Sequence, residues 1–193
     1  ITVMLEVLDF ELSDYTHYGT EFNCYSDIGK GWNLPHDWNT ATSHDSLERV
    51  VQRMLHEHRV FMDRMPYSHN PTNQASFRCA PVLNGASGDQ LSIQDWTDYD
   101  RRFGPYFDGS AFAGNPRDGI PIPFYYLPFH TEWPVRMPLP RGSSVFSDQA
   151  YIDGFTGVVT DFERHIDKMG WHRTTFFAYN NEKAHWGYQP WDL

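Results

Sequence analysis

The sequence predicts an α/β fold of the (β/α) TIM-barrel type, and only its first half, with about four strands and three helices. Strand-like and helix-like segments alternate about three times and end on a fourth strand, which implies a parallel sheet with right-handed crossovers. Polar and aromatic residues follow each strand, as in barrels whose sites are built from strand-exit loops. A nucleotide-binding sheet would show a glycine-rich first turn, but here the first strand leads into FNCYSD.

The first elements are two strands and the clearest helix of the chain. Residues 1–12 (ITVMLEVLDFEL) alternate well enough for a strand, and 20–25 (TEFNCY) fit a second short one. A start resembling a capping box at 45–48 (DSLE) and a following apolar stripe predict a helix that ends near Arg59. We expect His56 to be a surface residue and His58 a helix-end residue.

The rest of the chain repeats this alternation. After a strand over 60–65, a helix over 94–107 carries Trp96, Tyr99, Phe103 and Phe107 on one side and is closed by Gly109. Residues 120–127 are extended. A third helix over 151–169 is stopped by Gly170, and the fourth strand covers 174–179. Because half a barrel cannot close its sheet, we expect its remainder from further chain or another copy, so that the chain is a fragment of a larger domain.

Composition narrows the classes of partner. Aromatic residues make up 17% of the chain, which fits either a large aromatic core or stacking on sugar rings, and composition alone favours the core. The net charge is −10 and no basic stripe occurs, which argues against nucleic acid or an anionic membrane surface. No apolar run is long enough to span a bilayer. Cys24 and Cys79 form either a disulfide or two buried thiols, and neither has the spacing of a zinc ligand.

Six short segments, in order, resemble one known group. They are VLDFEL with the following TEFNCY, then MLHEHRV, YFDGSAF, FYYLPFHTEWP, HIDKMGW and FFAYNNEK. Together they span nearly the whole chain and resemble the catalytic barrel of glycoside hydrolase family 123-like proteins (the DUF4091 group). The resemblance implies that residues 1–18 are the connecting strand from an upstream β-sandwich and 19–193 the N-terminal half of the barrel. It also implies a secreted or periplasmic glycosidase, in the characterised branch one that removes terminal N-acetyl-β-galactosamine.

The resemblance also implies where the catalytic groups lie. Sugar hydrolysis uses two carboxyl groups, one of which protonates the leaving oxygen. In the family an adjacent Asp-Glu pair ends the fourth strand, and its Asp orients the substrate's own 2-acetamido group. This chain has Asn181 and Glu182 there, so Glu182 is the expected general acid. An amide stabilises an oxazolinium charge poorly, so Asn181 suits better a barrel glycosidase whose Asn-Glu pair binds the 2-hydroxyl and whose nucleophile lies on a later strand.

A second alignment places the catalytic pair elsewhere. It puts 188–193 (YQPWDL) in the Trp-containing stretch that precedes the acidic pair in the family. The pair would then follow Leu193, and Glu182 would be an exposed or Lys-paired residue of a loop.

Other strand exits carry candidate sugar-binding groups. Glu132, with His130 and Trp133, is suited to grip hydroxyls over an aromatic floor; the alternative is that Glu132 orders the loop and Trp133 packs on the barrel rim. No third ligand has the spacing for a metal at His130 and Glu132, so we expect neither a metal nor a cofactor. The remaining candidates for substrate binding are His69, Asn70, Asn73 and Asn180.

Three functions stay open. The leading hypothesis is an O-glycosyl hydrolase that acts on carbohydrate, by substrate assistance on an N-acetyl-hexosaminide or by double displacement on another glycoside. The first alternative is a non-catalytic carbohydrate-binding or scaffold barrel that keeps the aromatic cleft without the acid pair. The second is a metal-dependent barrel hydrolase, favoured by the ten histidines.

Overall fold

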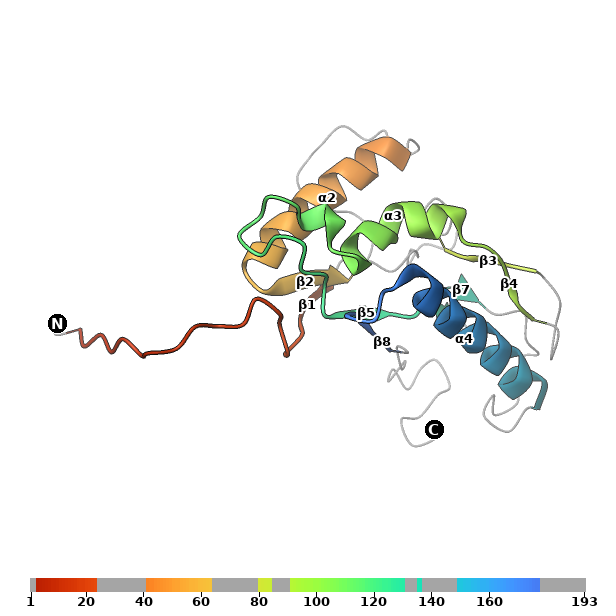
Figure 1. Cartoon of the computed structure of the whole chain (residues 1–193). Helices are drawn as coiled ribbons and strands as arrows, with labels where there is room; N and C mark the ends of the chain where they lie inside the picture. Colours follow the sequence, from red (N-terminus) through yellow and green to blue (C-terminus); the bar gives the residue numbers. More distant parts are fainter. Residues whose placement is uncertain are drawn as a thin grey trace, which may run out of the picture.

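The protein has a mixed α/β fold in the computed structural model, which describes residues 3–23, 41–63, 80–84, 91–130, 135–136 and 149–177 (Figure 1). Its main helices are α2 (Ala41–Glu57), α3 (Thr97–Phe107) and α4 (Gln149–Met169). Between these helices run short strands, most of which are paired in parallel. No helix in the described ranges is long and apolar enough to cross a membrane.

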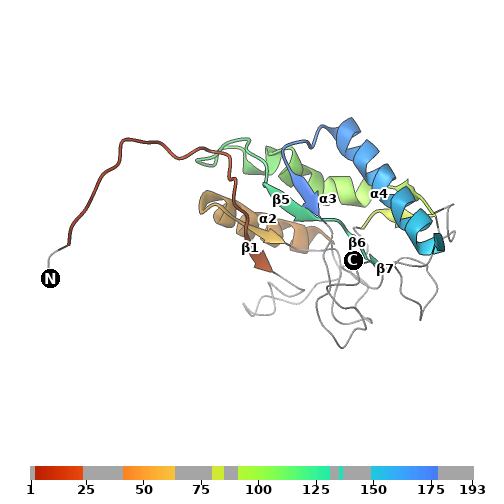
Figure 2. The same ribbon diagram turned by 90° about the horizontal axis from the view of Figure 1, so that it is seen from below.

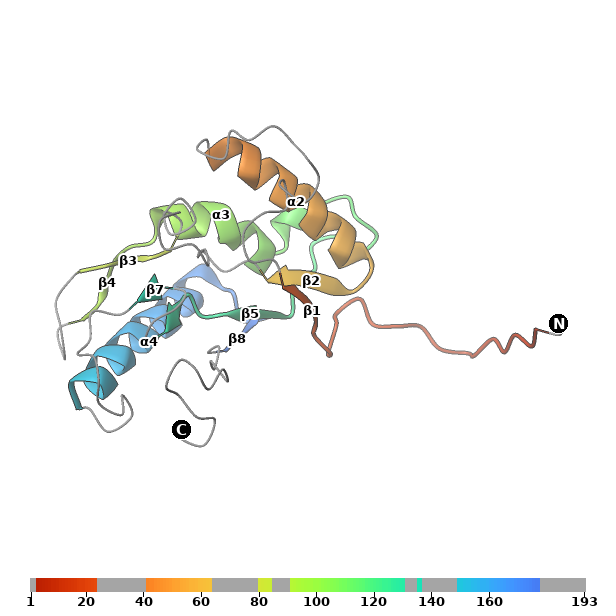
Figure 3. The same ribbon diagram turned by 180° about the vertical axis from the view of Figure 1, so that it is seen from behind.

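Four strands follow one another in space in their chain order. β1 (Thr20–Asn23) pairs in parallel with β2 (Val60–Asp63), and β5 (Phe124–Tyr126) pairs in parallel with β8 (Thr175–Phe177). β2 and β5 lie next to each other and run in the same direction (Figures 1 and 3), although no ladder of hydrogen bonds joins them. The carboxyl ends of all four strands therefore point the same way.

A glutamine explains why the strands divide into two pairs. The amide of Gln52, on α2, accepts a hydrogen bond from the Met62 N–H (3.0 Å) and donates one to the Met62 carbonyl oxygen. The N–H and C=O of one strand residue point to the same side of the strand. In Met62 both groups are hydrogen-bonded to the Gln52 side chain. Gln52 is buried, so it satisfies these two polar groups where a neighbouring strand would otherwise do so.

The three helices form one layer against the strands, as the view from below shows (Figure 2). Neighbouring helices are joined in chain order by polar pairs. Arg102 on α3 bonds to Glu48 on α2 at 2.6 Å, and His165 on α4 lies 2.7 Å from Asp100 on α3. Each successive strand–helix unit thus adds to both the strand layer and the helix layer.

The core between the two layers is largely aromatic. Phe107 of α3 makes ring contacts with Tyr125 of β5, Phe176 of β8 and Trp171, at centroid distances of 4.9–5.1 Å. Phe162 of α4 contacts Phe176 at 5.3 Å. The buried core of the described residues contains ten Phe, Tyr and Trp side chains, which agrees with the large-core interpretation of the composition.

The opposite face of the strands is also apolar. Successive strand residues point to opposite faces. Because Tyr125 and Phe176 face the helices, their neighbours Phe124, Tyr126 and Phe177 face away from them. Phe61 of β2 lies beside Phe124 with centroids 6.5 Å apart. Parallel strands that are apolar on both faces belong to sheets covered on both sides.

The two later helices agree well with the sequence pattern. α3 begins at Thr97, three residues after the expected start, and Tyr99, Phe103 and Phe107 are buried as expected. Gly109, after the helix, has a φ of 84°, and Gly170, after α4, has a φ of 73°. Both glycines adopt the left-handed conformation that ends helices and that residues with a Cβ avoid.

The first helix differs from the expectation at both its start and its faces. α2 begins at Ala41, so Glu48 lies in its middle, where it is 1% exposed and ion-paired, and it takes no part in a cap. Val50 and Met54, expected in the apolar stripe, are 63% and 46% exposed. His56 is buried, not on the surface, because the helix turns its polar residues Glu48, Gln52 and His56, at i, i+4 and i+8, inward.

Two small additions to the strand–helix alternation were not expected. β3 (Val82–Leu83) and β4 (Ile93–Asp95) form an antiparallel pair between β2 and α3. It packs against α4, where Asp161 accepts a hydrogen bond from the Ile93 N–H at 3.0 Å. β6 (Phe129–His130) and β7 (Val135–Arg136) pair in parallel, and a 3₁₀ helix η3 (Ser110–Phe112) follows α3.

Residues 3–12, expected as a strand, form no strand and lie exposed in an arm that extends from the body (Figure 1). The arm ends where residues 13–16 meet three arginines, each from a connection between a helix and the next strand. Arg59 donates to the Ser13 carbonyl, and Arg117 donates to the Asp14 carbonyl at 2.7 Å. The Arg173 carbonyl accepts from the Tyr15 hydroxyl at 2.9 Å. Residues 13–16 are thereby fastened at the amino ends of β2, β5 and β8.

Candidate functional site

The expected site residues follow the carboxyl ends of the strands. His69, Asn70 and Asn73 come after β2, and they lie outside the described residues. Glu132 and Trp133, after β6, and Asn180, Asn181 and Glu182, after β8, also lie outside them. Cys24 and Cys79 are likewise outside. The described strands fix where these segments leave the sheet: β2, β5 and β8 are consecutive neighbours, so the three segments leave from the same end of one layer.

His130 is the one candidate whose backbone is described. It is the last residue of β6 and pairs with Arg136 of β7 in a parallel register. The preceding residue, Phe129, is buried and packs against Phe162 of α4 with centroids 6.2 Å apart. The segment after β5 is therefore held against α4 immediately before the expected Glu132 and Trp133.

Two aromatic residues at the strand ends were not among the expected site residues. Tyr126 and Phe177 are the last residues of β5 and β8 and are register partners. Their ring centroids lie 4.2 Å apart at an interplanar angle of 64°, and both side chains are half-buried. They point away from the helix layer. The alternation of the two strands, FYY and TFF, was a signal in the sequence that placed them on that face.

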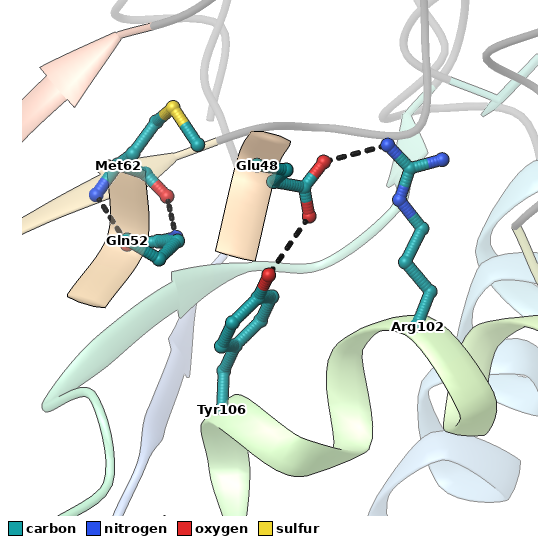
Figure 4. A network of polar contacts seen from close by, with 5 residues as sticks. All are labelled: Glu48, Gln52, Met62, Arg102 and Tyr106. Carbon is teal, nitrogen blue, oxygen red and sulfur yellow. Dashed lines mark hydrogen bonds and ion pairs between the residues drawn. The ribbon is translucent and has the colours of Figure 1, made fainter. Parts of the chain in front are cut away.

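A network of polar contacts lies elsewhere, between α2, α3 and β2 (Figure 4). The carboxylate of Glu48 bonds to Arg102 at 2.6 Å and accepts from the Tyr106 hydroxyl at 3.4 Å. Burial and the adjacent Glu48 charge raise the pKa of Tyr106 above its usual range, so the phenol stays protonated and donates. These side chains are at most 7% exposed, so they join two helices and do not face a substrate.

His56 is a second buried polar residue on the same face of α2. Its ring stacks on Phe112 of η3 with centroids 3.7 Å apart, and its Nε2 lies 2.9 Å from the Ile120 carbonyl oxygen. Burial first, and then the nearby Arg117 and Arg53, lower its pKa to about 4. The ring is therefore neutral, and its Nε2–H donates a hydrogen bond to the Ile120 carbonyl oxygen. Its Nδ1 has no hydrogen-bond partner among the described residues.

A histidine–carboxylate pair also joins α3 and α4. His165 is 6% exposed, contacts Asp100 at 2.7 Å and stacks on Trp96 with centroids 3.8 Å apart. A His–Asp pair orients a catalytic base in some hydrolases. Here the imidazole edge packs on Trp171 of the core, at a centroid distance of 5.3 Å, and the pair lies within the helix layer. It supports the packing of the two helices.

Neither metal ligands among the described residues nor similar proteins assign a function to the chain. Within the described ranges, no three His, Cys, Asp or Glu side chains are grouped as metal ligands. No protein-family model, no curated protein and no solved structure gave a significant match to the chain.

Proposed function

We propose that this chain is the first half of a (β/α)-barrel glycoside hydrolase, and that its sugar site is formed at the carboxyl ends of β1, β2, β5 and β8. One observation carries the proposal: the four strands are neighbours in chain order and run in one direction beneath a single layer of helices. In (β/α) barrels the catalytic groups lie at that end of the strands.

The residues at the strand exits supply the chemistry of this proposal. Glu182 protonates the glycosidic oxygen, and Asn181 holds the 2-substituent of the sugar. Glu132 and His130 bind hydroxyl groups, and Trp133 packs on the ring. His69, Asn70, Asn73 and Asn180 complete the polar wall. The nucleophile, or the group that assists it, lies on a later strand or on the substrate's own acetamido group.

The catalytic assignment is tested by turnover of aryl glycosides with and without a 2-acetamido group. We expect wild type to release the aryl alcohol from at least one glycoside. Glu182→Gln should lower kcat by about 100-fold or more, because a general acid typically contributes this much. Glu163→Gln, an exposed carboxylate on α4, is the matched control and should leave kcat unchanged. Unchanged turnover in Glu182→Gln would eliminate Glu182 as the acid.

The same panel separates the competing functions. Sugar binding without turnover of any glycoside would favour the carbohydrate-binding barrel. Stoichiometric zinc in the purified protein would favour a metal-dependent hydrolase and reject the glycosidase. A strict requirement for the acetamido group would assign the nucleophile to the substrate despite Asn181.

A further inference from the structure

We propose that Tyr126 and Phe177 form an aromatic floor on which one pyranose ring of the substrate stacks. The inference rests on the proposed function and names a part of the site that the sequence motifs do not contain. The two rings end neighbouring parallel strands and contact each other directly, with centroids 4.2 Å apart.

The direction of both side chains follows from their neighbours. Tyr125 packs on Phe103 and Phe107 of α3, and Phe176 packs on Phe107 and Phe162 of the helix layer. Tyr126 and Phe177 come next in their strands and therefore point to the opposite face. In the proposed barrel that face is the interior, and the last strand residues line its catalytic end.

Position along the strands distinguishes these rings from the aromatic residues nearer the amino ends. On the same face Phe61 is 3% exposed and packs beside Phe124. Gly19 fits there only without a Cβ, which would lie 2.6 Å from the Phe124 ring. At this level of the strands Phe124 is partly exposed, as Tyr126 and Phe177 are, and its register partner Thr175 is exposed. Tyr126 and Phe177, one step closer to the exits, each keep part of their surface open to solvent.

The chemistry of the pair suits a sugar better than a charged ligand. The two ring planes meet at 64°, so they form a corner with one flat face and one edge. The apolar face of a pyranose packs on such a ring as an apolar group does, while its hydroxyls remain available to hydrogen-bonding groups at the rim. A neutral sugar ring also needs no cationic partner in a chain whose net charge is −10.

The test replaces each ring by a smaller apolar side chain, in Tyr126→Leu and Phe177→Leu. Turnover of the aryl glycoside that wild type hydrolyses fastest is measured at several concentrations, with circular dichroism to check folding. We expect KM to rise about 3- to 10-fold because one ring-stacking contact is lost, and kcat to stay within about twofold of wild type. Tyr126→Phe, which keeps the ring, should retain the wild-type KM.

Phe176→Leu is the matched control, because it removes a ring from the same strand on the helix side and should leave KM unchanged. Folded Tyr126→Leu and Phe177→Leu variants with wild-type KM would overturn the aromatic floor and leave the glycosidase intact. A KM raised equally in Phe176→Leu would also overturn it, since the effect would then be general. A wild type that neither hydrolyses nor binds any sugar of the panel would reject the proposed function itself, and the floor with it.

Discussion

At the scale of single residues, the buried Glu48–Arg102 pair joins the first two helices. Arg102→Met would remove the arginine that pairs at 2.6 Å with a carboxylate that is 1% exposed. We expect the free energy of unfolding to fall by roughly 3–5 kcal/mol, as for other buried pairs that lose one partner. Urea unfolding measures this loss. The control Arg101→Met removes an exposed arginine, 3.7 Å from Asp98, and should change the value by about 0.5 kcal/mol or less. Equal losses in the two variants would contradict a role for the buried pair.

The buried His56 makes the free energy of unfolding depend on pH. Its pKa is about 4 in the folded chain and 6.5 as the ordinary value, so the unfolded chain binds the proton more readily. The contribution of the neutral ring is complete above about pH 6.5 and is lost as the pH falls toward 4. We expect the free energy of unfolding of wild type to fall by up to about 3 kcal/mol more than that of His56→Gln over this pH window. This value is the free-energy equivalent of the lowered pKa of His56. Urea unfolding at pH 7 and pH 4.5 measures this difference.

The exposed His58, which directly follows α2, provides the matched control variant. His58→Gln keeps the buried His56 and should still lose stability as the pH falls from 6.5 toward 4. If the stability difference between wild type and His56→Gln stays constant with pH, the buried neutral ring is not the titrating group.

The sequence predicted the roles of single residues that depend on local sequence pattern. It did not predict the roles of residues whose burial depends on tertiary packing. The helix-ending role of Gly109 and Gly170 could be read directly, because a left-handed residue after a helix favours glycine. The burial of Glu48, Gln52 and His56 could not. Polar residues at helical spacing are expected to face solvent. Their burial is favourable here because they meet polar partners elsewhere in the chain, among them Arg102, Met62 and Ile120.

At the scale of elements, the antiparallel pair β3–β4 depends on a close approach to α4. A Cβ on Gly157 would lie 2.7 Å from the Leu91 carbonyl oxygen, a backbone atom that cannot swing aside. Gly157→Ala should therefore lower the free energy of unfolding by roughly 1–3 kcal/mol, despite the better helix propensity of alanine.

Thermal unfolding of Gly157→Ala beside Thr156→Ala tests this contact. Thr156 is the exposed neighbour on α4, so its replacement changes helix propensity without the steric clash. A gain in stability in both variants would show that α4 and the β3–β4 pair do not approach so closely.

The elements themselves were largely predictable, apart from the antiparallel insertion and the arm. α3 and α4 have long stripes of large apolar residues, which sequence periodicity detects well. β3 and β4 are two and three residues long, too short for alternation to show. The arm over residues 3–12 alternates like a strand, but pairing needs a neighbour, and the described residues offer it none.

At the scale of the whole molecule, the order of strands and helices is the main agreement with the sequence. Alternating strands and helices predicted parallel neighbours, and β1, β2, β5 and β8 are neighbours in that order. The division between β2 and β5 could not be predicted, because it follows from one glutamine that takes the backbone groups of Met62. The apolar face opposite the helices fits strands that are covered on both sides, as a closed barrel would cover them.

The central claim is that the exits of these strands form a sugar site. Amide hydrogen exchange, with and without the sugar released from the best glycoside of the panel, tests it most directly. We expect the sugar to slow exchange in the segments after β2, β5 and β8, which carry His69, Glu132 and Glu182, and to leave the arm and the outer helix layer unchanged. Protection confined to the arm or to α2, α3 and α4, or none at saturating sugar, would contradict the claim.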